Sequence, residues 1–240
     1  MVTKIIAHRG ASGLVEFDNS FESFRKAIEI GADMVEFDVR RTEDGKLIAF
    51  HDPSLEGEEI SSLTYEEIQE ITDDKGYNVP AVEDVVLLFK DKIGLDIELK
   101  EGGYEDEVIK IVKRHLDYDE FIMKSFLDSA VKAVKEYDDN IKTGLLLGIE
   151  DPEYKIKTRL SELFPKGRLK RCGLDFVAPN YQLLKLFFLR RMKYSDIDVF
   201  VWTVNNPVRM NRLMRKAVEG IITDRPDIAL EVKRNIIAHD

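Results

Sequence analysis

Short apolar runs alternate with longer amphipathic stretches from one end of the chain to the other. Eight of the apolar runs are predicted as strands: residues 4–8, 34–40, 93–100, 121–126, 142–147, 175–180, 199–204 and 220–223. Eight longer stretches are predicted as helices: residues 20–30, 82–90, 105–116, 128–136, 153–163, 183–192, 207–217 and 226–234. Alternating strands and helices are typical of a parallel sheet covered by helices, and eight repeats favour a closed (β/α)8 TIM barrel.

The segment after the second predicted strand interrupts this alternation. Glu43-Asp44-Gly45 predicts a tight turn and residues 46–50 a returning strand, so we expect His51 at the rim beside the end of the second strand. Residues 53–80 are acidic and rich in turn residues, with one predicted helix over 65–71. We therefore expect one barrel domain over residues 1–240 with a small insertion in the second βα loop, at about 43–80.

Composition and charge exclude several classes of protein. The 240 residues are 44% hydrophobic and 34% charged, and the net charge of −10 disfavours binding to nucleic acid. Cys172 is the only cysteine, which excludes an intrachain disulfide and a zinc site built from several cysteines. Lys4 leaves no room for the apolar part of a signal peptide, so we expect a cytoplasmic protein without a transmembrane segment.

Three carboxylates lie near the carboxyl ends of the second and third predicted strands. Glu36 and Asp38 share one face of their strand, and Glu98 lies on the next strand along the chain. Catalytic groups of a barrel gather at this end, where crowded carboxylates need a cation to offset their repulsion. Ligands that are all oxygen suit one Mg²⁺ or Ca²⁺ ion. The alternative is a cluster of ion pairs with neighbouring Arg and Lys side chains.

Two histidines and two basic residues accompany these carboxylates. His8 and His51 both lie at predicted strand ends and are candidates for a general acid and a general base, although one histidine alone is often structural. Arg9 offers a bidentate fork and Lys100 a compact charge for a phosphate group. Salt bridges to the carboxylates are the alternative role of both.

Several motifs carry a resemblance to the glycerophosphodiester phosphodiesterase family. They are His8-Arg9-Gly10, Asn19-Ser20-Phe21, Gly31-Ala32-Asp33, Glu36-Phe37-Asp38-Val39, Thr42-Glu43-Asp44-Gly45, His51-Asp52, Glu98-Leu99-Lys100, Trp202-Thr203-Val204-Asn205 and Thr223-Asp224-Arg225-Pro226. The chain departs from the family at residues 17–20, where Phe-Asp-Asn-Ser replaces the usual Pro-Glu-Asn-Thr. The resemblance implies a barrel with an insertion, a divalent cation, and hydrolysis of a small glycerophosphodiester to glycerol phosphate and an alcohol.

By motif position, the resemblance assigns a role to each of the residues above. It implies that Glu36, Asp38 and Glu98 hold the metal, that His8 and His51 are the acid and base, and that Arg9 and Lys100 contact the phosphate. Two alternatives stay open: a phospholipase-D-like enzyme of the same barrel that acts on lysophospholipids, and a catalytically silent barrel that only binds phosphodiesters.

Three further features have no assigned role. Trp202, the only tryptophan, is a candidate apolar wall for the glycerol moiety or else a core side chain. Lys124 lies in a predicted strand whose inward face is not determined. Residues 183–191 combine apolar and basic side chains and suit either a lipid surface or, as we expect, a helix packed on the sheet.

Overall fold

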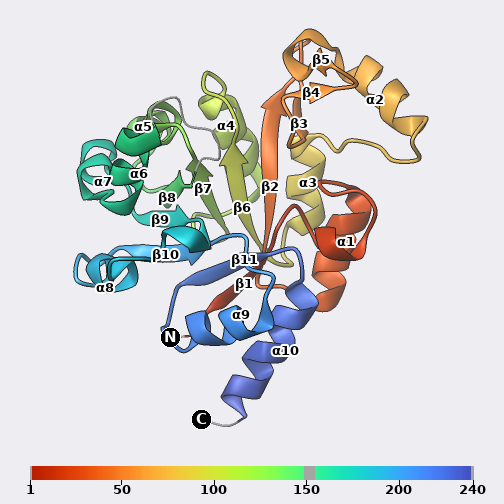
Figure 1. The fold of residues 1–240 in the computed structure, drawn as a ribbon. Helices are drawn as coiled ribbons and strands as arrows, with labels where there is room; N and C mark the ends of the chain where they lie inside the picture. Colours follow the sequence, from red (N-terminus) through yellow and green to blue (C-terminus); the bar gives the residue numbers. More distant parts are fainter. Residues whose placement is uncertain (1, 149–154, 239–240) are drawn as a thin grey trace.

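Eight parallel strands close into a barrel in the computed structural model, which describes residues 2–148 and 155–238 (Figure 1). In chain order the barrel strands are β1 (Lys4–Ala7), β2 (Met34–Arg41), β6 (Gly94–Leu99), β7 (Phe121–Ser125), β8 (Thr143–Leu147), β9 (Phe176–Pro179), β10 (Asp198–Val201) and β11 (Gly220–Thr223). Each strand pairs with its neighbours in sequence, and β1 pairs with both β2 and β11, which closes the ring. The predicted TIM barrel is confirmed.

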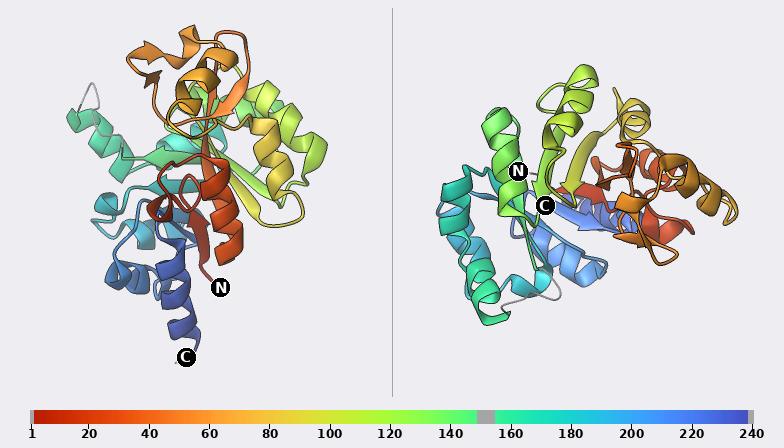
Figure 2. Two further views of the ribbon diagram at one scale, coloured as in Figure 1. Left: turned by 90° about the vertical axis from the view of Figure 1, so that its right-hand side faces the viewer. Right: turned by 90° about the horizontal axis from the view of Figure 1, so that it is seen from above.

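Helices cover the outside of the barrel, as both views of Figure 2 show. They are α1 (Phe21–Ile30), α3 (Val82–Phe89), α4 (Glu105–His115), α5 (Asp128–Tyr137), α6 (Lys155–Leu163), α7 (Lys166–Cys172), α8 (Phe188–Lys193), α9 (Pro207–Met214) and α10 (Pro226–Ile237), with 3-10 turns η1 (Ser12–Leu14) and η3 (Tyr181–Leu183). Local sequence sets their ends. In α1, Ser20 and Ser23 form a capping box, and Gly31 ends the helix in the left-handed conformation at φ 81°.

Apolar side chains fill the barrel interior at the end where the strands begin. The rings of Phe176 and Phe200 meet edge to face, with centroids 4.9 Å apart. Gly144 and Gly220 make room for them, because a Cβ atom at either position would lie within 2.5 Å of a ring carbon. The base of the barrel is therefore closed, and the buried polar side chains gather toward the other end.

The insertion after β2 forms a small structure of its own above the barrel rim (Figure 1). It contains β3 (Leu47–Ala49), antiparallel to β2, then β4 (Ser54–Leu55), β5 (Glu58–Glu59), η2 (Ile60–Ser62) and α2 (Tyr65–Asp73). The predicted hairpin and the predicted helix in the insertion are thus confirmed. A separate apolar cluster holds the insertion together: Ile48, Leu55, Ile60, Leu63, Ile68 and Val79.

One helix predicted for the second half of the chain needs correction, and one helix there was not predicted. The helix expected over 183–192 is wrong: the chain forms η3 after β9, Leu186 and Phe187 adopt positive φ angles of 49° and 58°, and α8 begins only at Phe188. Helix α7 was not predicted, because its seven residues bury only Leu169 and Cys172 and show no clear apolar stripe.

The helix expected over 153–163 is present as α6, although residues 153–154 lie outside the described part of the chain. The other predicted helices agree with the structure to within three residues at each end. No helix among residues 2–148 and 155–238 combines the length and the apolar character that a membrane span needs.

Candidate catalytic and metal site

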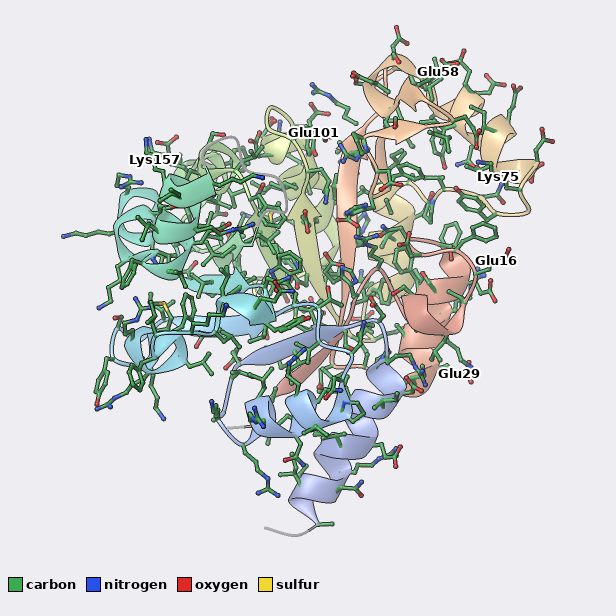
Figure 3. All side chains as sticks on the ribbon, viewed as in Figure 1. Glu16, Glu29, Glu58, Lys75, Glu101 and Lys157 are labelled. Atoms are coloured by element: carbon green, nitrogen blue, oxygen red, sulfur yellow. The ribbon has the colours of Figure 1, made fainter. Side chains whose placement is uncertain are left out.

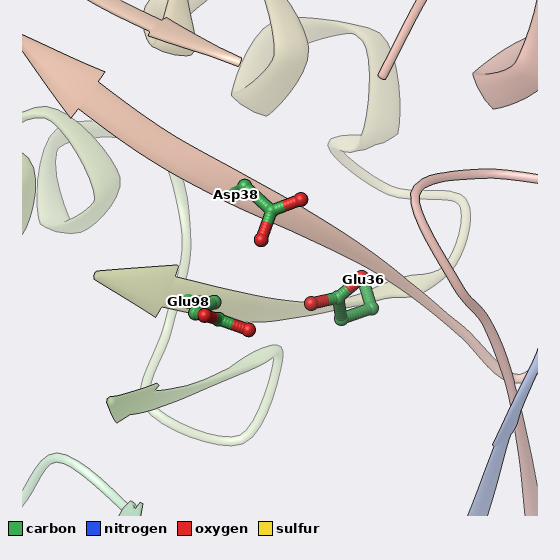
Figure 4. Close-up of side chains that lie close together, drawn as sticks. All are labelled: Glu36, Asp38 and Glu98. Carbon is green, nitrogen blue, oxygen red and sulfur yellow. The ribbon is translucent and has the colours of Figure 1, made fainter. Parts of the chain in front are cut away.

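The three predicted metal ligands meet at the carboxyl end of the barrel. Asp38 of β2 and Glu98 of β6 are direct neighbours in the parallel register, and Glu36 lies two residues before Asp38 on the same face. One carboxylate oxygen from each residue lies within 4.8 Å of the others, and all three side chains are buried (Figure 4). Oxygens bound to one Ca²⁺ at about 2.3–2.6 Å are separated by at most about 5 Å, so the donor set fits a single hard cation.

Lys100 and Arg9 lie against this cluster. The Nζ atom of Lys100 is 2.7 Å from Glu98 Oε1 and 3.3 Å from Asp38 Oδ1. Arg9 Nε is 3.3 Å from Asp38 Oδ2, and its backbone N–H donates to Glu36 Oε2 at 3.0 Å. Both residues therefore form the salt bridges that were the alternative to phosphate binding, and their contact with a phosphate stays a prediction.

A second buried ion pair, absent from the sequence prediction, lies deeper in the barrel. Lys124 of β7 points inward, with its Nζ atom 2.7 Å from Asp96 Oδ2 and 3.4 Å from Glu36 Oε1. Lys124 and Asp96 are both almost fully buried. Burial disfavours the charged lysine, but Asp96 and then Glu36 outweigh that effect and raise its pKa. The charge of Lys124 therefore stabilises the Glu36 carboxylate from the inner side of the barrel.

The buried cluster has more negative than positive charge. Glu36, Asp38, Asp96 and Glu98 share three cationic side chains, those of Arg9, Lys100 and Lys124. Burial, and then the charge of Asp38, raises the pKa of Glu98 to about 7. Burial also acts to raise the pKa of Asp38, but Lys100 and Arg9 outweigh it and lower that pKa to about 2. One carboxylate thus lacks a matching cation, a deficit that either a proton or a metal ion can correct.

His8 follows β1 at the same end of the barrel and is held by an aspartate. Its Nδ1 atom lies 2.6 Å from Asp224 Oδ1, and its Nε2 atom lies 3.9 Å from Glu36 Oε2. Asp224 follows β11 and also accepts hydrogen bonds from Ser12 and Asn205. Burial opposes charge on His8, but Glu36 and Asp224 outweigh it and raise its pKa.

His51 lies at the same end because the β2–β3 hairpin returns the chain there. The N–H of Phe50 donates to the carbonyl of Asp38 at 3.0 Å, and the Arg40 guanidinium donates to the carbonyl of His51 at 2.7 and 2.9 Å. The Nδ1 atom of His51 lies 2.7 Å from Asp52 Oδ1. Each histidine thus has an aspartate at Nδ1, which leaves Nε2 to exchange protons with another group.

The loop that departs from the family pattern still reaches the site. Asp18 Oδ2 accepts a hydrogen bond from Arg9 at 2.9 Å, and Asn19 Nδ2 donates to Asp38 Oδ2 at 2.9 Å. Gly10 has φ 81°, and a Cβ atom there would lie 2.4 Å from Ser23 Oγ. The close approach of this loop to α1 therefore requires a glycine.

Trp202, which follows β10, is partly buried at the top of the barrel interior. Its Nε1–H donates to the carbonyl of Ala178 at 2.7 Å, and its ring meets that of Phe126 at a centroid distance of 5.6 Å. The hydrogen bond fixes the indole ring, so one side of the mouth has a rigid apolar surface.

Sequence reasoning missed several residues that complete this geometry. It quoted Asn19 and Asp224 in motifs without a role, and it assigned no role to Asp96. A polar residue at the end of the last barrel strand was the available signal for Asp224. The face of Lys124 follows from its register opposite Glu98, which only the folded barrel shows.

A closed (β/α)8 barrel with acidic, basic and histidine side chains at its carboxyl end has the architecture of an enzyme, and these side chains suit phosphoryl chemistry. Residues 8–228 match the glycerophosphoryl diester phosphodiesterase family, and the chain belongs to that family. The family resemblance seen in the motifs is therefore confirmed.

Known proteins similar to this chain cover nearly its whole length. A glycerophosphodiester phosphodiesterase from Caldanaerobacter subterraneus subsp. tengcongensis is 30% identical over 98% of this chain and 99% of its own. The crystal structure of a glycerophosphodiester phosphodiesterase from Parabacteroides distasonis is 27% identical, with a TM-score of 0.80 and 98% of each chain covered.

A third similar protein was solved with a product. It is a phosphodiesterase from Oleispira antarctica in complex with sn-glycerol-3-phosphate, 20% identical, with a TM-score of 0.81 and 96% of each chain covered. At this identity the likeness supports the fold alone.

Proposed function

We propose that this protein is a metal-dependent hydrolase of small glycerophosphodiesters, releasing glycerol phosphate and an alcohol. The observation that carries the proposal is the buried triad of Glu36, Asp38 and Glu98 beside His8. The shortage of positive charge around the triad supports a divalent cation, and its all-oxygen donors favour Mg²⁺ or Ca²⁺.

The cation, when bound, neutralises charge on the phosphoryl oxygens and lowers the pKa of an oxygen nucleophile. Arg9 and Lys100 lie against the triad, where their charges can orient a phosphodiester and stabilise the negative charge that develops during the reaction. Trp202 and Phe126 offer an apolar surface for the glycerol moiety. In this proposal the cation, Arg9 and Lys100 together bind one phosphate group.

His8 and His51 share the proton transfers in this proposal. Asp224 holds His8 at Nδ1, so the proton moves at Nε2, and Asp52 holds His51 in the same way. One imidazole takes a proton from the attacking hydroxyl as the P–O bond to the nucleophile forms. The other gives a proton to the departing alkoxide as its P–O bond breaks. The nucleophile is either water or the neighbouring glycerol hydroxyl, the latter through a cyclic phosphate that water then opens.

The second candidate substrate is a lysophospholipid. Such a substrate needs an apolar path to the site, but the insertion above the mouth presents the charged side chains of Glu56, Glu58 and Glu59 (Figure 3 labels Glu58). The small, water-soluble diester is therefore favoured. The predicted cytoplasmic location and the predicted domain limits stay predictions.

Product analysis with two histidine variants tests the proposal. Glycerophosphocholine, glycerophosphoethanolamine and a lysophospholipid are compared as substrates of wild type, His8→Ala and His51→Ala. Loss of general acid–base assistance lowers kcat by about 10²- to 10⁴-fold in both variants and leaves metal affinity nearly unchanged.

The matched control is His115→Ala, because His115 pairs with Glu83 on the outside of the barrel. It keeps wild-type turnover. Near-normal turnover in His8→Ala or His51→Ala would remove that histidine from the mechanism, and preferred cleavage of the lysophospholipid would reassign the substrate.

A further inference from the structure

Positive charge is concentrated in one part of this acidic protein. Residues 155–194 contain eleven Lys and Arg and two acidic residues, a net charge of +9 in a chain whose total is −10. Six of these lysines have no acidic partner among the described residues: Lys155, Lys157, Lys166, Lys170, Lys185 and Lys193. Figure 3 shows Lys157 on the side of the molecule away from Glu58 and Lys75 of the insertion.

The same region exposes apolar side chains in a pattern opposite to that of an ordinary surface helix. In α6, Ile156, Leu160 and the following Phe164 are spaced by four residues and share one face, with exposed fractions of 79%, 54% and 53%. The one buried residue of α6 is Glu162, which accepts from the backbone N–H of Gly148 and pairs with Arg159. Helix α6 therefore turns its acidic residue inward and its apolar stripe outward.

The start of α8 extends this stripe. Leu186 and Phe187 are 60% and 79% exposed, and both hold left-handed backbone angles that residues with side chains rarely adopt. Arg191, one turn after Phe187, stacks on the ring of Phe164 at 4.4 Å and donates to the carbonyl of Leu163 at 2.7 Å. Arg191 thus joins the α6 stripe to the α8 segment, and the two form one continuous surface, here called the α6–α8 surface.

We propose that the α6–α8 surface docks this protein reversibly on an anionic lipid bilayer. Basic side chains around exposed apolar ones match the two parts of such a bilayer, its charged head groups and its acyl boundary. Duplex nucleic acid would satisfy the charges but has no apolar layer for Ile156 and Phe187 to enter. The rest of the molecule carries net negative charge and is repelled by the anionic bilayer, so the protein is oriented with the α6–α8 surface toward the membrane.

Sedimentation with vesicles tests the proposal, using pure phosphatidylcholine and phosphatidylcholine with about 30% phosphatidylglycerol. Wild type binds the anionic vesicles, and binding weakens as NaCl rises from about 50 to 500 mM. Charge reversal in K157E/K193E lowers the affinity at least about 25-fold, on the basis of roughly fivefold for each basic residue near the surface. The apolar variant I156Q/F187Q lowers it roughly tenfold or more.

Matched controls separate this surface from general charge and hydrophobicity. K90E and V208Q change an exposed lysine and an exposed apolar residue elsewhere, and both bind the anionic vesicles like wild type. Hydrolysis of a soluble diester is unchanged in all four variants, so failure of docking is distinguishable from failure of the proposed function.

Two results would overturn the proposal. The first is no binding of wild type to anionic vesicles at low salt. The second is binding to heparin or duplex DNA at least as tight as to vesicles and unaffected by I156Q/F187Q, which would make the surface a polyanion site.

Discussion

Asp224→Asn removes one charge from the site without changing the size of the side chain. Burial acts to raise the pKa of Asp224, but the hydrogen bond from His8 leads the effects that lower it from 3.8 to about 2. That difference corresponds to about 2 kcal/mol of stabilisation of the carboxylate by its surroundings. If His8 becomes protonated in the transition state, losing its partner lowers kcat by up to roughly 30-fold, because Asn205 and Ser12 supply part of this stabilisation. A wrong ring tautomer lowers kcat further, to about 10²-fold or more.

The assay measures kcat and KM with the preferred glycerophosphodiester, together with the melting temperature. KM stays within about threefold of wild type, because Asp224 does not contact the phosphate ligands. The melting temperature falls by a few degrees, since a carboxylate with a lowered pKa stabilises the fold at pH values above its unfolded pKa. Asp227→Asn, in the first turn of α10 and paired with Arg225, is the matched control and keeps normal kcat. An unchanged kcat in Asp224→Asn would refute the view that Asp224 positions a proton-transferring His8.

Two further variants test the buried framework of the site. Lys124→Met leaves the buried carboxylates of Asp96 and Glu36 without the lysine that they contact, which lowers the free energy of unfolding by about 3–5 kcal/mol. The melting temperature falls by roughly 10 °C. In the control Lys132→Met, which removes an exposed ion pair, the melting temperature changes by no more than a few degrees. Equal melting temperatures would contradict this. Gly10 and Gly31 both have a positive φ, but a Cβ atom at Gly10 clashes with Ser23, whereas one at Gly31 meets nothing within 4 Å. The free energy of unfolding measured in urea is therefore lower by about 1–3 kcal/mol for Gly10→Ala than for Gly31→Ala. Equal losses in the two glycine variants would remove the steric argument.

The barrel and the gathering of candidate site residues at its carboxyl end could be predicted because their signals are local in sequence. The strand period places Glu36 and Asp38 on one face, and the tight turn at Gly45 returns the chain to the rim near His51. Contacts between distant residues could not be predicted in this way. His8 and Asp224 are 216 positions apart in the sequence. Whether the side chains of Lys124 and Asp96 point into the barrel depends on the tilt and register of its strands.

The error over residues 183–192 has a different cause. The apolar pattern there suits a helix, but Asn180 accepts a hydrogen bond from the N–H of Gln182 and holds a 3-10 turn directly after β9. The positive φ angles of Leu186 and Phe187 then delay the start of α8. Hydrophobic pattern alone does not distinguish side chains buried on the barrel from those turned outward, because both are apolar.

The central claim is that Glu36, Asp38 and Glu98 hold one divalent cation that catalysis requires. The most direct measurement is the rate of diester hydrolysis as a function of free Mg²⁺ or Ca²⁺, for wild type, Glu98→Gln and Glu107→Gln, a half-buried control on α4 that pairs with Arg41. Metal-free wild type is predicted to be inactive and to recover fully on addition of the ion, as is Glu107→Gln. Glu98→Gln needs at least about tenfold more metal for half its maximal rate, because one anionic ligand is gone. Full turnover by rigorously metal-free wild type would contradict the claim.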